Sequence, residues 1–222
     1  MDRHFDTELQ KLKDLILSMG GNVEQAIEHA TQALLLREPE RLDRVFELET
    51  QVNKSHLLVD ETCLNLLARQ APMANDLRMI IAIMKINTDL ERMGDQAVNI
   101  AHNSKRYLAE PPLKPLIDLP RMAEDVRSMV RDSLDSLVKR DPVLATEVLN
   151  RDDRVDAFKN QIFRELITYM IGDPRTIERA LNLILIARNL ERVGDHATNI
   201  AEDVIFAITG RDVRHGAGGA GQ

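Results

Sequence analysis

Two segments of this chain, one hundred positions apart, have almost the same sequence. Residues 90–101 read LERMGDQAVNIA and residues 190–201 read LERVGDHATNIA, so that nine of the twelve residues are identical. The stretches before them repeat as well, because a series of apolar residues spaced by seven begins at Val45 and again at Val148, 103 positions later. A chain that repeats over such a period is expected to fold as two copies of one structural unit.

Apolar residues recur every three or four positions in six stretches, which is the pattern of amphipathic helices. Prolines separate these stretches, and a proline inside a helix costs about 3 kcal/mol, so they mark helix boundaries. Aromatic residues make up only 3% of the chain, which favours helix over strand. The predicted helices cover residues 9–36, 40–69, 74–107, 121–139, 143–170 and 175–209.

Short connections between these helices make successive helices antiparallel neighbours. The sequence therefore predicts an all-α fold of two tandem, pseudo-symmetric, antiparallel three-helix bundles. The first bundle is predicted over residues 1–109 and the second over residues 121–210. A proline-rich linker, residues 110–120, joins them, and the glycine-rich residues 211–222 are predicted to form a flexible tail.

Charge and cysteine content limit the classes of function. A formal net charge of −7 argues against nucleic acid as the main partner, because phosphate contacts need a basic surface. The single cysteine, Cys63, cannot form an intrachain disulfide and indicates a reducing compartment. The N-terminal sequence is too highly charged for a signal peptide, and the apolar runs are far shorter than a membrane span. These features predict a soluble, cytoplasmic protein.

Each copy of the repeated segment carries Glu, Asp and Asn at intervals of four residues. Residues four apart form one ridge along a helix, and two carboxylates at that spacing repel each other unless a cation lies nearby. The ridges are Glu91, Asp95 and Asn99, and Glu191, Asp195 and Asn199. Gly94 and Gly194 lie beside the ridges. Because glycine lowers helix propensity, its presence in both copies indicates that another group approaches the helix backbone there.

The second helix of each unit carries a matching polar pair. The pairs are Glu49 with Asn53, and Asp152 with Asp156. If the second and third helices are antiparallel neighbours, each pair faces a ridge, and clustered oxygen ligands of this kind bind hard cations such as Mg²⁺, Mn²⁺, Ca²⁺ or iron. The second-half cluster has one carboxylate more than the first, which predicts tighter binding there. The alternative is that both ridges are solvated faces, paired with Arg92 and Arg192.

The motifs ERMGD…NI and ERVGD…NI, each on the third helix of a three-helix unit, resemble those of the PhoU family. The resemblance extends to SMGGNVEQAI near the start, NDLRMI before the third helix and ITYMIGDPRTI in the second half, and it covers residues 8–210. It implies a cytoplasmic adaptor that is not an enzyme. Such an adaptor couples a phosphate ABC transporter to a sensor histidine kinase and holds the phosphate-starvation response off when phosphate is plentiful.

The same resemblance implies partners and a metal. It implies a homodimer that binds a PstB-type transporter ATPase and a PhoR-type sensor kinase, and that reaches the membrane only through these partners. It also implies a divalent or trivalent metal ion, such as iron, zinc, manganese or magnesium. Carried over to this chain, the ligands are Glu91, Asp95, Glu191 and Asp195, with Glu49, Asp152 and Asp156 on the facing helices. Asn53 departs from the family's pattern of two carboxylates on the facing helix.

Two other classes of protein are compatible with paired carboxylates in a helical bundle. A carboxylate-bridged di-iron enzyme needs Glu-x-x-His pairs on two helices, and here Asp stands four residues after each Glu with no histidine at the required spacing. A purely structural helical protein, with both ridges in solvent and no ligand, is the second alternative. Metal analysis separates this structural protein from the other two classes.

Overall fold

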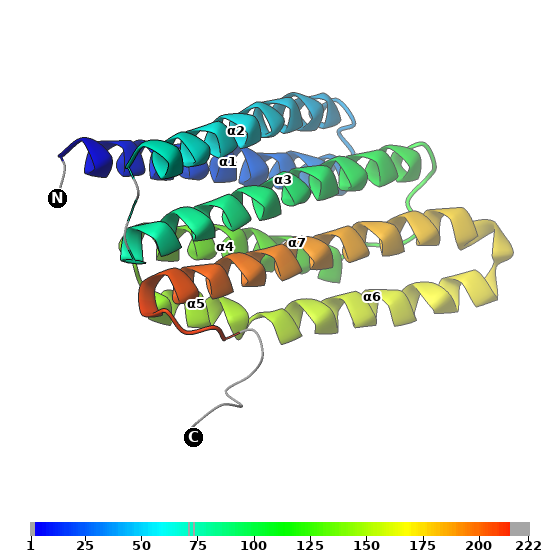
Figure 1. The fold of residues 1–222 in the computed structure, drawn as a ribbon. Helices are drawn as coiled ribbons and strands as arrows, with labels where there is room; N and C mark the ends of the chain where they lie inside the picture. The colour runs from blue at the N-terminus through cyan, green and yellow to red at the C-terminus, as the bar shows by residue number, and fades with distance from the viewer. Residues whose placement is uncertain (1–2, 71, 73, 214–222) are drawn as a thin grey trace, which may run out of the picture.

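The computed structural model describes residues 3–70, 72 and 74–213, and these residues contain helices and no strand. The first half consists of α1 (Arg3–Leu36), α2 (Arg41–Gln70) and α3 (Ala74–Leu108). The second half consists of α4 (Asp118–Lys139), α5 (Pro142–Leu149), α6 (Asp152–Gly172), the short 3₁₀ turn η1 (Pro174–Thr176) and α7 (Ile177–Thr209) (Figure 1). The prediction of an all-α fold built from two three-helix bundles is confirmed.

The prediction of one helix over residues 143–170 is wrong, because α5 ends at Leu149 and α6 begins at Asp152. The backbone N–H of Arg151 donates to the carbonyl of Val148, three residues back, so the regular four-residue ladder is interrupted. The Arg151 guanidinium is drawn sideways to Asp132 of α4, with Nη1 2.5 Å from Oδ2. Asn150 has low helix propensity, so the sequence offers little resistance to this break.

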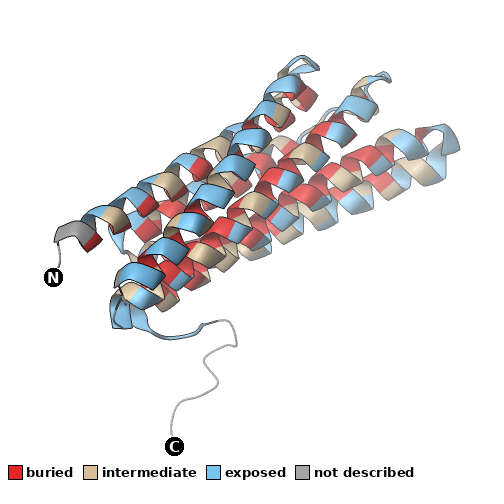
Figure 2. Ribbon diagram, turned by 45° about the horizontal axis from the view of Figure 1, so that its top comes forward, coloured by how far each residue is buried: buried red, intermediate tan, exposed pale blue. Residues whose placement is uncertain are grey.

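The helices α3 and α7 lie side by side and antiparallel at the centre of the molecule (Figure 1). Buried residues lie on the sides of the helices that face one another, and exposed residues lie on the outside (Figure 2). Leu90 and Leu190, which are equivalent in the repeat, are both fully buried. The buried side chains of the two halves form one continuous hydrophobic core. Since each buried leucine contributes about 2 kcal/mol, the halves stabilise each other.

The segment that joins the halves is irregular over residues 109–117, and α4 begins at Asp118, within the segment predicted as linker. Side chains from both halves hold it. Arg37 at the end of α1 donates to the carbonyls of Leu108 and Glu110, and Arg179 of α7 donates to the carbonyl of Pro111. At the other end of the chain, residues 211–213 are irregular. Residues 214–222 of the predicted tail lie outside the described residues.

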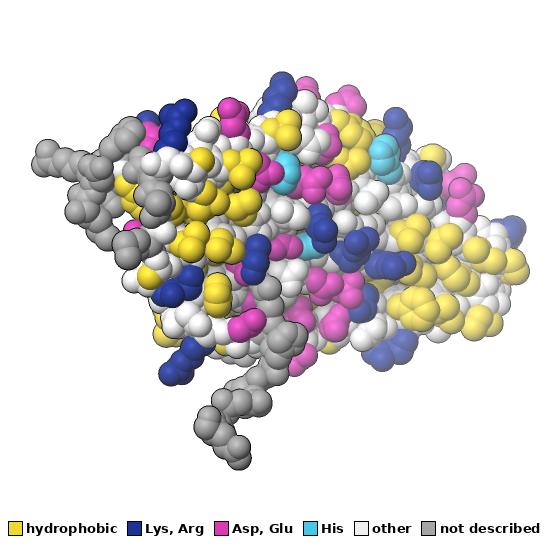
Figure 3. Space-filling model, viewed as in Figure 1, with side chains coloured by type: hydrophobic (Ala, Val, Ile, Leu, Met, Phe, Trp, Pro, Cys, Tyr) yellow, Lys and Arg dark blue, Asp and Glu magenta, His cyan; other side chains and the backbone are white. Residues whose placement is uncertain are grey.

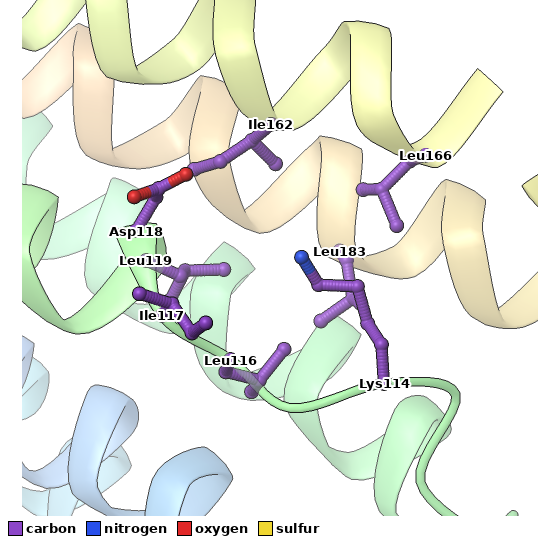
Figure 4. Close-up of a pocket in the computed structure, with 8 residues that line it drawn as sticks. All are labelled: Lys114, Leu116, Ile117, Asp118, Leu119, Ile162, Leu166 and Leu183. Atoms are coloured by element: carbon purple, nitrogen blue, oxygen red, sulfur yellow. The ribbon is translucent and has the colours of Figure 1, made fainter. Parts of the chain in front are cut away.

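A small pocket lies under this joining segment, between α4, α6 and α7 (Figure 4). Its walls are mostly apolar, and the Lys114 side chain enters it from the joining segment. Only 8% of the Lys114 side chain is exposed, and its ammonium forms an ion pair with Glu165 of α6. The pocket is therefore the place where the joining segment is fastened to the second half.

Candidate functional site

The two glycines beside the carboxylate ridges mark the closest approach of neighbouring helices. A methyl group added at Gly94 would lie 3.2 Å from Cγ1 of Val52 on α2, and one added at Gly194 would lie 3.4 Å from Cγ1 of Val155 on α6. Val52 and Val155 are equivalent in the repeat. The prediction that another group approaches both glycines is confirmed, and α2 and α6 pack against α3 and α7 in the same register.

The second half brings four predicted carboxylates together. The pKa of Asp195 is raised by burial and then by the negative charges of Glu191, Asp152 and Asp156. The pKa of Asp152 is likewise raised by burial and then by neighbouring carboxylates, Asp156 first among them. The α6 pair lies opposite the α7 ridge, as the sequence predicts, because one side chain reaches both Asp156 of α6 and Glu191 of α7. A residue that the sequence analysis did not select, Lys159 of α6, lies among them.

The Lys159 ammonium donates hydrogen bonds to Oδ1 of Asp156 and Oε1 of Glu191, each at 2.7 Å. These contacts raise the pKa of Lys159, because each carboxylate favours the charged ammonium. The side chain is 28% exposed, so the contact lies partly out of solvent. A cation provided by the chain itself therefore bridges one carboxylate of α6 and one of α7 in the second-half cluster.

The first half arranges its polar residues differently. The Asn53 amide donates to Oε1 of Glu49 at 2.6 Å, within α2. Glu91 is half-buried and Asp95 is exposed, and neither forms a hydrogen bond or an ion pair with any residue that the structure describes. His56 stands one turn beyond Asn53, at the position equivalent to Lys159. No lysine or arginine among the described residues forms an ion pair with these carboxylates.

The donor sets fit a metal ion to different degrees. The first half offers oxygen atoms of Glu49, Asn53, Glu91 and Asp95, which suit a hard cation. Nδ1 of His56, at the position equivalent to Lys159, is buried without a hydrogen-bond partner among the described residues. In the second half, Lys159 already neutralises two of the carboxylates. Among the described residues, no three Asp, Glu, His or Cys side chains are gathered in a ready-made metal site. Metal binding by these residues stays a prediction.

The asparagines at the ends of the two ridges lie apart from the carboxylates. Asn199 Nδ2 is 3.4 Å from Oδ1 of Asp89, so it contacts α3 and not α6. Asn99 is exposed and accepts a hydrogen bond from Asn103 through its backbone carbonyl. Within the described part of the chain, Arg92 and Arg192 form no ion pair with either ridge. The alternative that these arginines neutralise the ridges therefore has no support in the structure.

Sequence reasoning also missed a polar strip along the contact between α3 and α7. Lys85 Nζ lies 3.2 Å from Oδ1 of the buried Asp203. One turn along α3, Asp89 Oδ1 lies 2.8 Å from Nδ1 of His196. The sequence contains one signal for this strip: each of its four residues differs from the residue at the equivalent position of the other copy. The residues at the equivalent positions are Leu185, Asn103, Asn189 and Gln96.

Exposed apolar side chains gather at two places on the face shown in Figure 3, where α2 meets α3 and where α6 meets α7, with charged side chains between them. We call these places the first and second apolar patches. The first comprises Leu64, Leu77 and Ile81, and the second comprises Phe163, Ile171, Ile177 and Leu181. Leu77 is equivalent to Ile177, and Ile81 to Leu181, so the repeat produces two related patches. No helix within the described residues is long and apolar enough to cross a membrane.

Replacing Asp195 by asparagine is expected to stabilise the metal-free protein at neutral pH. The folded-state pKa of Asp195 is raised, so folding favours its protonated form; that advantage is complete below the unfolded pKa and is lost as the pH rises through the folded pKa. At pH 7 the ionised carboxylate is partly desolvated and repels its neighbours, which costs about 0.5 kcal/mol, or a melting temperature lower by about 1–2 °C. Thermal unfolding in chelator at pH 7 measures the gain.

The matched control for this substitution is Asp95→Asn in the first half, which has Asn53 where the second half has Asp156. A smaller gain is expected there, because fewer carboxylates face Asp95. At a pH below the ordinary range of aspartate, the stabilisation by Asp195→Asn should disappear. Equal stabilisation by both variants, or an effect independent of pH, would contradict repulsion as its cause.

Comparison with known proteins agrees with this duplicated architecture. The family model of the PhoU domain matches the chain twice, over residues 16–104 and 119–204. The chain is 41% identical over 216 residues to a phosphate-specific transport system accessory protein PhoU homolog of Pseudomonas putida, an alignment that covers 97% of this chain and 84% of that protein.

Two crystal structures have the same fold. The structure of PhoU from Pseudomonas aeruginosa superposes with a TM-score of 0.90 at 39% identity and covers 93% of this chain and 100% of that one. The structure of the phosphate transport system regulatory protein PhoU from Streptococcus pneumoniae superposes with a TM-score of 0.86 at 28% identity and covers 94% and 99% of the two chains. The duplicated domain matches, the sequence identity over almost the whole chain and the shared fold together establish that this chain belongs to the PhoU family.

Proposed function

We propose that this chain is an accessory protein of a phosphate-specific transporter and a negative regulator of the phosphate-starvation response. In this role it acts in the cytoplasm, as an adaptor between a PstB-type ATPase of the transporter and a PhoR-type sensor histidine kinase. It restrains phosphate uptake and kinase signalling when phosphate is plentiful. It is a homodimer without catalytic activity of its own, and it reaches the membrane through these partners.

The observation that carries the proposal is the match of both copies of the PhoU domain across almost the whole chain. The relatives that it resembles are named as accessory proteins of phosphate-specific transport. Both copies of the domain are present in this chain, which supports the same role.

The surface supports an adaptor that binds folded proteins. Isolated exposed apolar residues are common, but grouped ones mark interaction sites. Here two related groups, the first and second apolar patches, flank a band of charged side chains on one face (Figure 3). Apolar anchors with a polar surround are the usual composition of a protein interface. We assign the contact with the transporter ATPase to this face.

The metal-binding part of the proposal concerns the carboxylate ridges. Glu49, Asn53, Glu91 and Asp95 would hold a cation such as iron, zinc, manganese or magnesium in the first half. A bound cation would remove the repulsion between Glu91 and Asp95 and add positive charge to α2 and α3, the helices that carry the first apolar patch of the proposed docking face. Metal occupancy would thereby alter how this face attracts a charged partner.

The regulatory role is tested in a strain that lacks this gene and grows in ample phosphate. Secreted phosphatase activity, which reports on the starvation response, is expected to rise to the level of phosphate-starved wild-type cells. Reintroducing the wild-type gene should return the activity to its low level. Low phosphatase activity in the deletion strain would contradict the proposed negative regulation.

The docking face is tested with charge substitutions in both patches. The double variant Ile81→Glu and Leu181→Glu is expected to weaken binding to the ATPase by about 2 kcal/mol or more, which is more than tenfold in Kd. Both side chains are already exposed, so the fold should persist. Binding of the purified proteins, measured by calorimetry, gives the Kd. The control is Val143→Glu, which changes an equally apolar, exposed residue of α5 outside both patches; an equal loss of affinity in that control would show that the effect is not specific to the patches.

A further inference from the structure

We propose that Lys159 is a built-in counter-ion that closes the second carboxylate cluster to metal, so that metal binding by this chain takes place in the first half alone. The inference rests on the metal-binding part of the proposed function. It reverses the expectation from carboxylate number, by which the second half would bind a cation more tightly.

The Lys159 ammonium contacts the carboxylates in the way that a bound cation would. Its Nζ makes two hydrogen bonds of 2.7 Å, one to each of the helices that form the cluster, through Asp156 on α6 and Glu191 on α7. Distances of this length are typical of charge-assisted hydrogen bonds. A metal ion at the same carboxylates would lie next to a like charge, and it would compete with the ammonium for the same oxygen atoms.

The ammonium contacts one carboxylate on each of the two helices of this cluster. Its positive charge therefore reduces the attraction that the second half exerts on a divalent cation.

The first half lacks such a counter-ion at the equivalent position. His56 replaces Lys159 there, and its Nε2 points towards Asp60, 3.5 Å from Oδ2. Its other nitrogen, Nδ1, is buried and has no hydrogen-bond partner among the described residues. Imidazole nitrogen is a ligand for zinc, copper, iron and nickel, whereas an ammonium group is not. The amino-acid difference at this one position makes the two related clusters chemically unequal.

The test counts Mn²⁺ ions bound by the purified full-length protein, using equilibrium dialysis and the electron paramagnetic resonance signal of bound Mn²⁺. The wild-type protein is expected to bind one ion per chain. Asp95→Asn should lower the affinity at least about tenfold, the effect of losing roughly 1.4 kcal/mol of binding, whereas Asp195→Asn should leave it unchanged. Lys159→Gln should create a second site, and Lys159→Arg, which keeps the positive charge, should not.

A reciprocal exchange makes the test independent of any single variant. His56→Lys places an ammonium in the first cluster and should abolish its binding, while Lys159→His should open the second. Circular dichroism checks that each variant remains helical. Two ions per wild-type chain, or loss of binding on Asp195→Asn, would overturn the inference. Binding by neither the wild-type protein nor Lys159→Gln would overturn it too, yet the phosphatase assay of the deletion strain would still decide the regulatory role separately.

Discussion

Replacing Lys85 by leucine is expected to destabilise the folded protein by about 1–2 kcal/mol, because the buried carboxylate of Asp203 loses the ammonium beside it. Only 2% of the Asp203 side chain is exposed, and Lys85 Nζ lies 3.2 Å from its Oδ1. For a chain of this size, such a loss lowers the melting temperature by about 2–8 °C. Differential scanning calorimetry at pH 7 measures the change.

The repeat provides the control for this prediction. The positions equivalent to Lys85 and Asp203 hold Leu185 and Asn103, neither of which carries a charge. The double variant Lys85→Leu and Asp203→Asn copies that neutral pair and should recover most of the lost stability. Asp203→Asn alone should cost little, since Lys85 is 42% exposed and can turn to solvent. If the double variant is as unstable as Lys85→Leu alone, the buried charge is not the cause.

The parts of the structure that the sequence predicts well depend on a single helix and its nearest neighbour. Apolar periodicity locates the helices, and glycines in both copies of a repeat indicate a close helix contact. The matching contacts of Val52 with Gly94 and of Val155 with Gly194 follow from the same repeat. The same periodicity, combined with the antiparallel packing of neighbouring helices, predicts that Asp156 lies opposite the ridge on α7. Lys159 contacts both Asp156 and Glu191 there.

The parts that the sequence does not predict depend on contacts between more distant elements. The break after α5 accompanies the attachment of Arg151 to Asp132 on α4, which no periodicity reveals. From the sequence, Lys159 cannot be distinguished from a lysine on a solvated helix face. Its contact with Glu191 depends on how α7 packs against α6. The pair of Lys85 and Asp203 forms because the two halves pack through α3 and α7, and that packing is a property of the whole molecule.

Replacing Gly20 by leucine is expected to destabilise the protein by about 3 kcal/mol, because α1 and α4 touch at this residue and an added side chain overfills the contact. A methyl group built at Gly20 already overlaps Cδ1 of Leu134 on α4 and lies 3.4 Å from its Cγ. Leu134 is 3% exposed and is enclosed by the core. Denaturant unfolding, monitored by circular dichroism, gives the loss of stability.

The neighbouring Gly21 separates packing from helix propensity, because a methyl group built there meets no atom within 4 Å. Both substitutions by leucine gain helix propensity of somewhat under 1 kcal/mol, so Gly21→Leu should stabilise slightly whereas Gly20→Leu should not. Truncating the obstacle with Leu134→Ala should cost less in the Gly20→Leu background than in the wild-type protein, since the new side chain fills the space. If Leu134→Ala costs the same stability in both backgrounds, the contact between α1 and α4 does not limit what fits at residue 20. The two halves would then be held together mainly through α3 and α7.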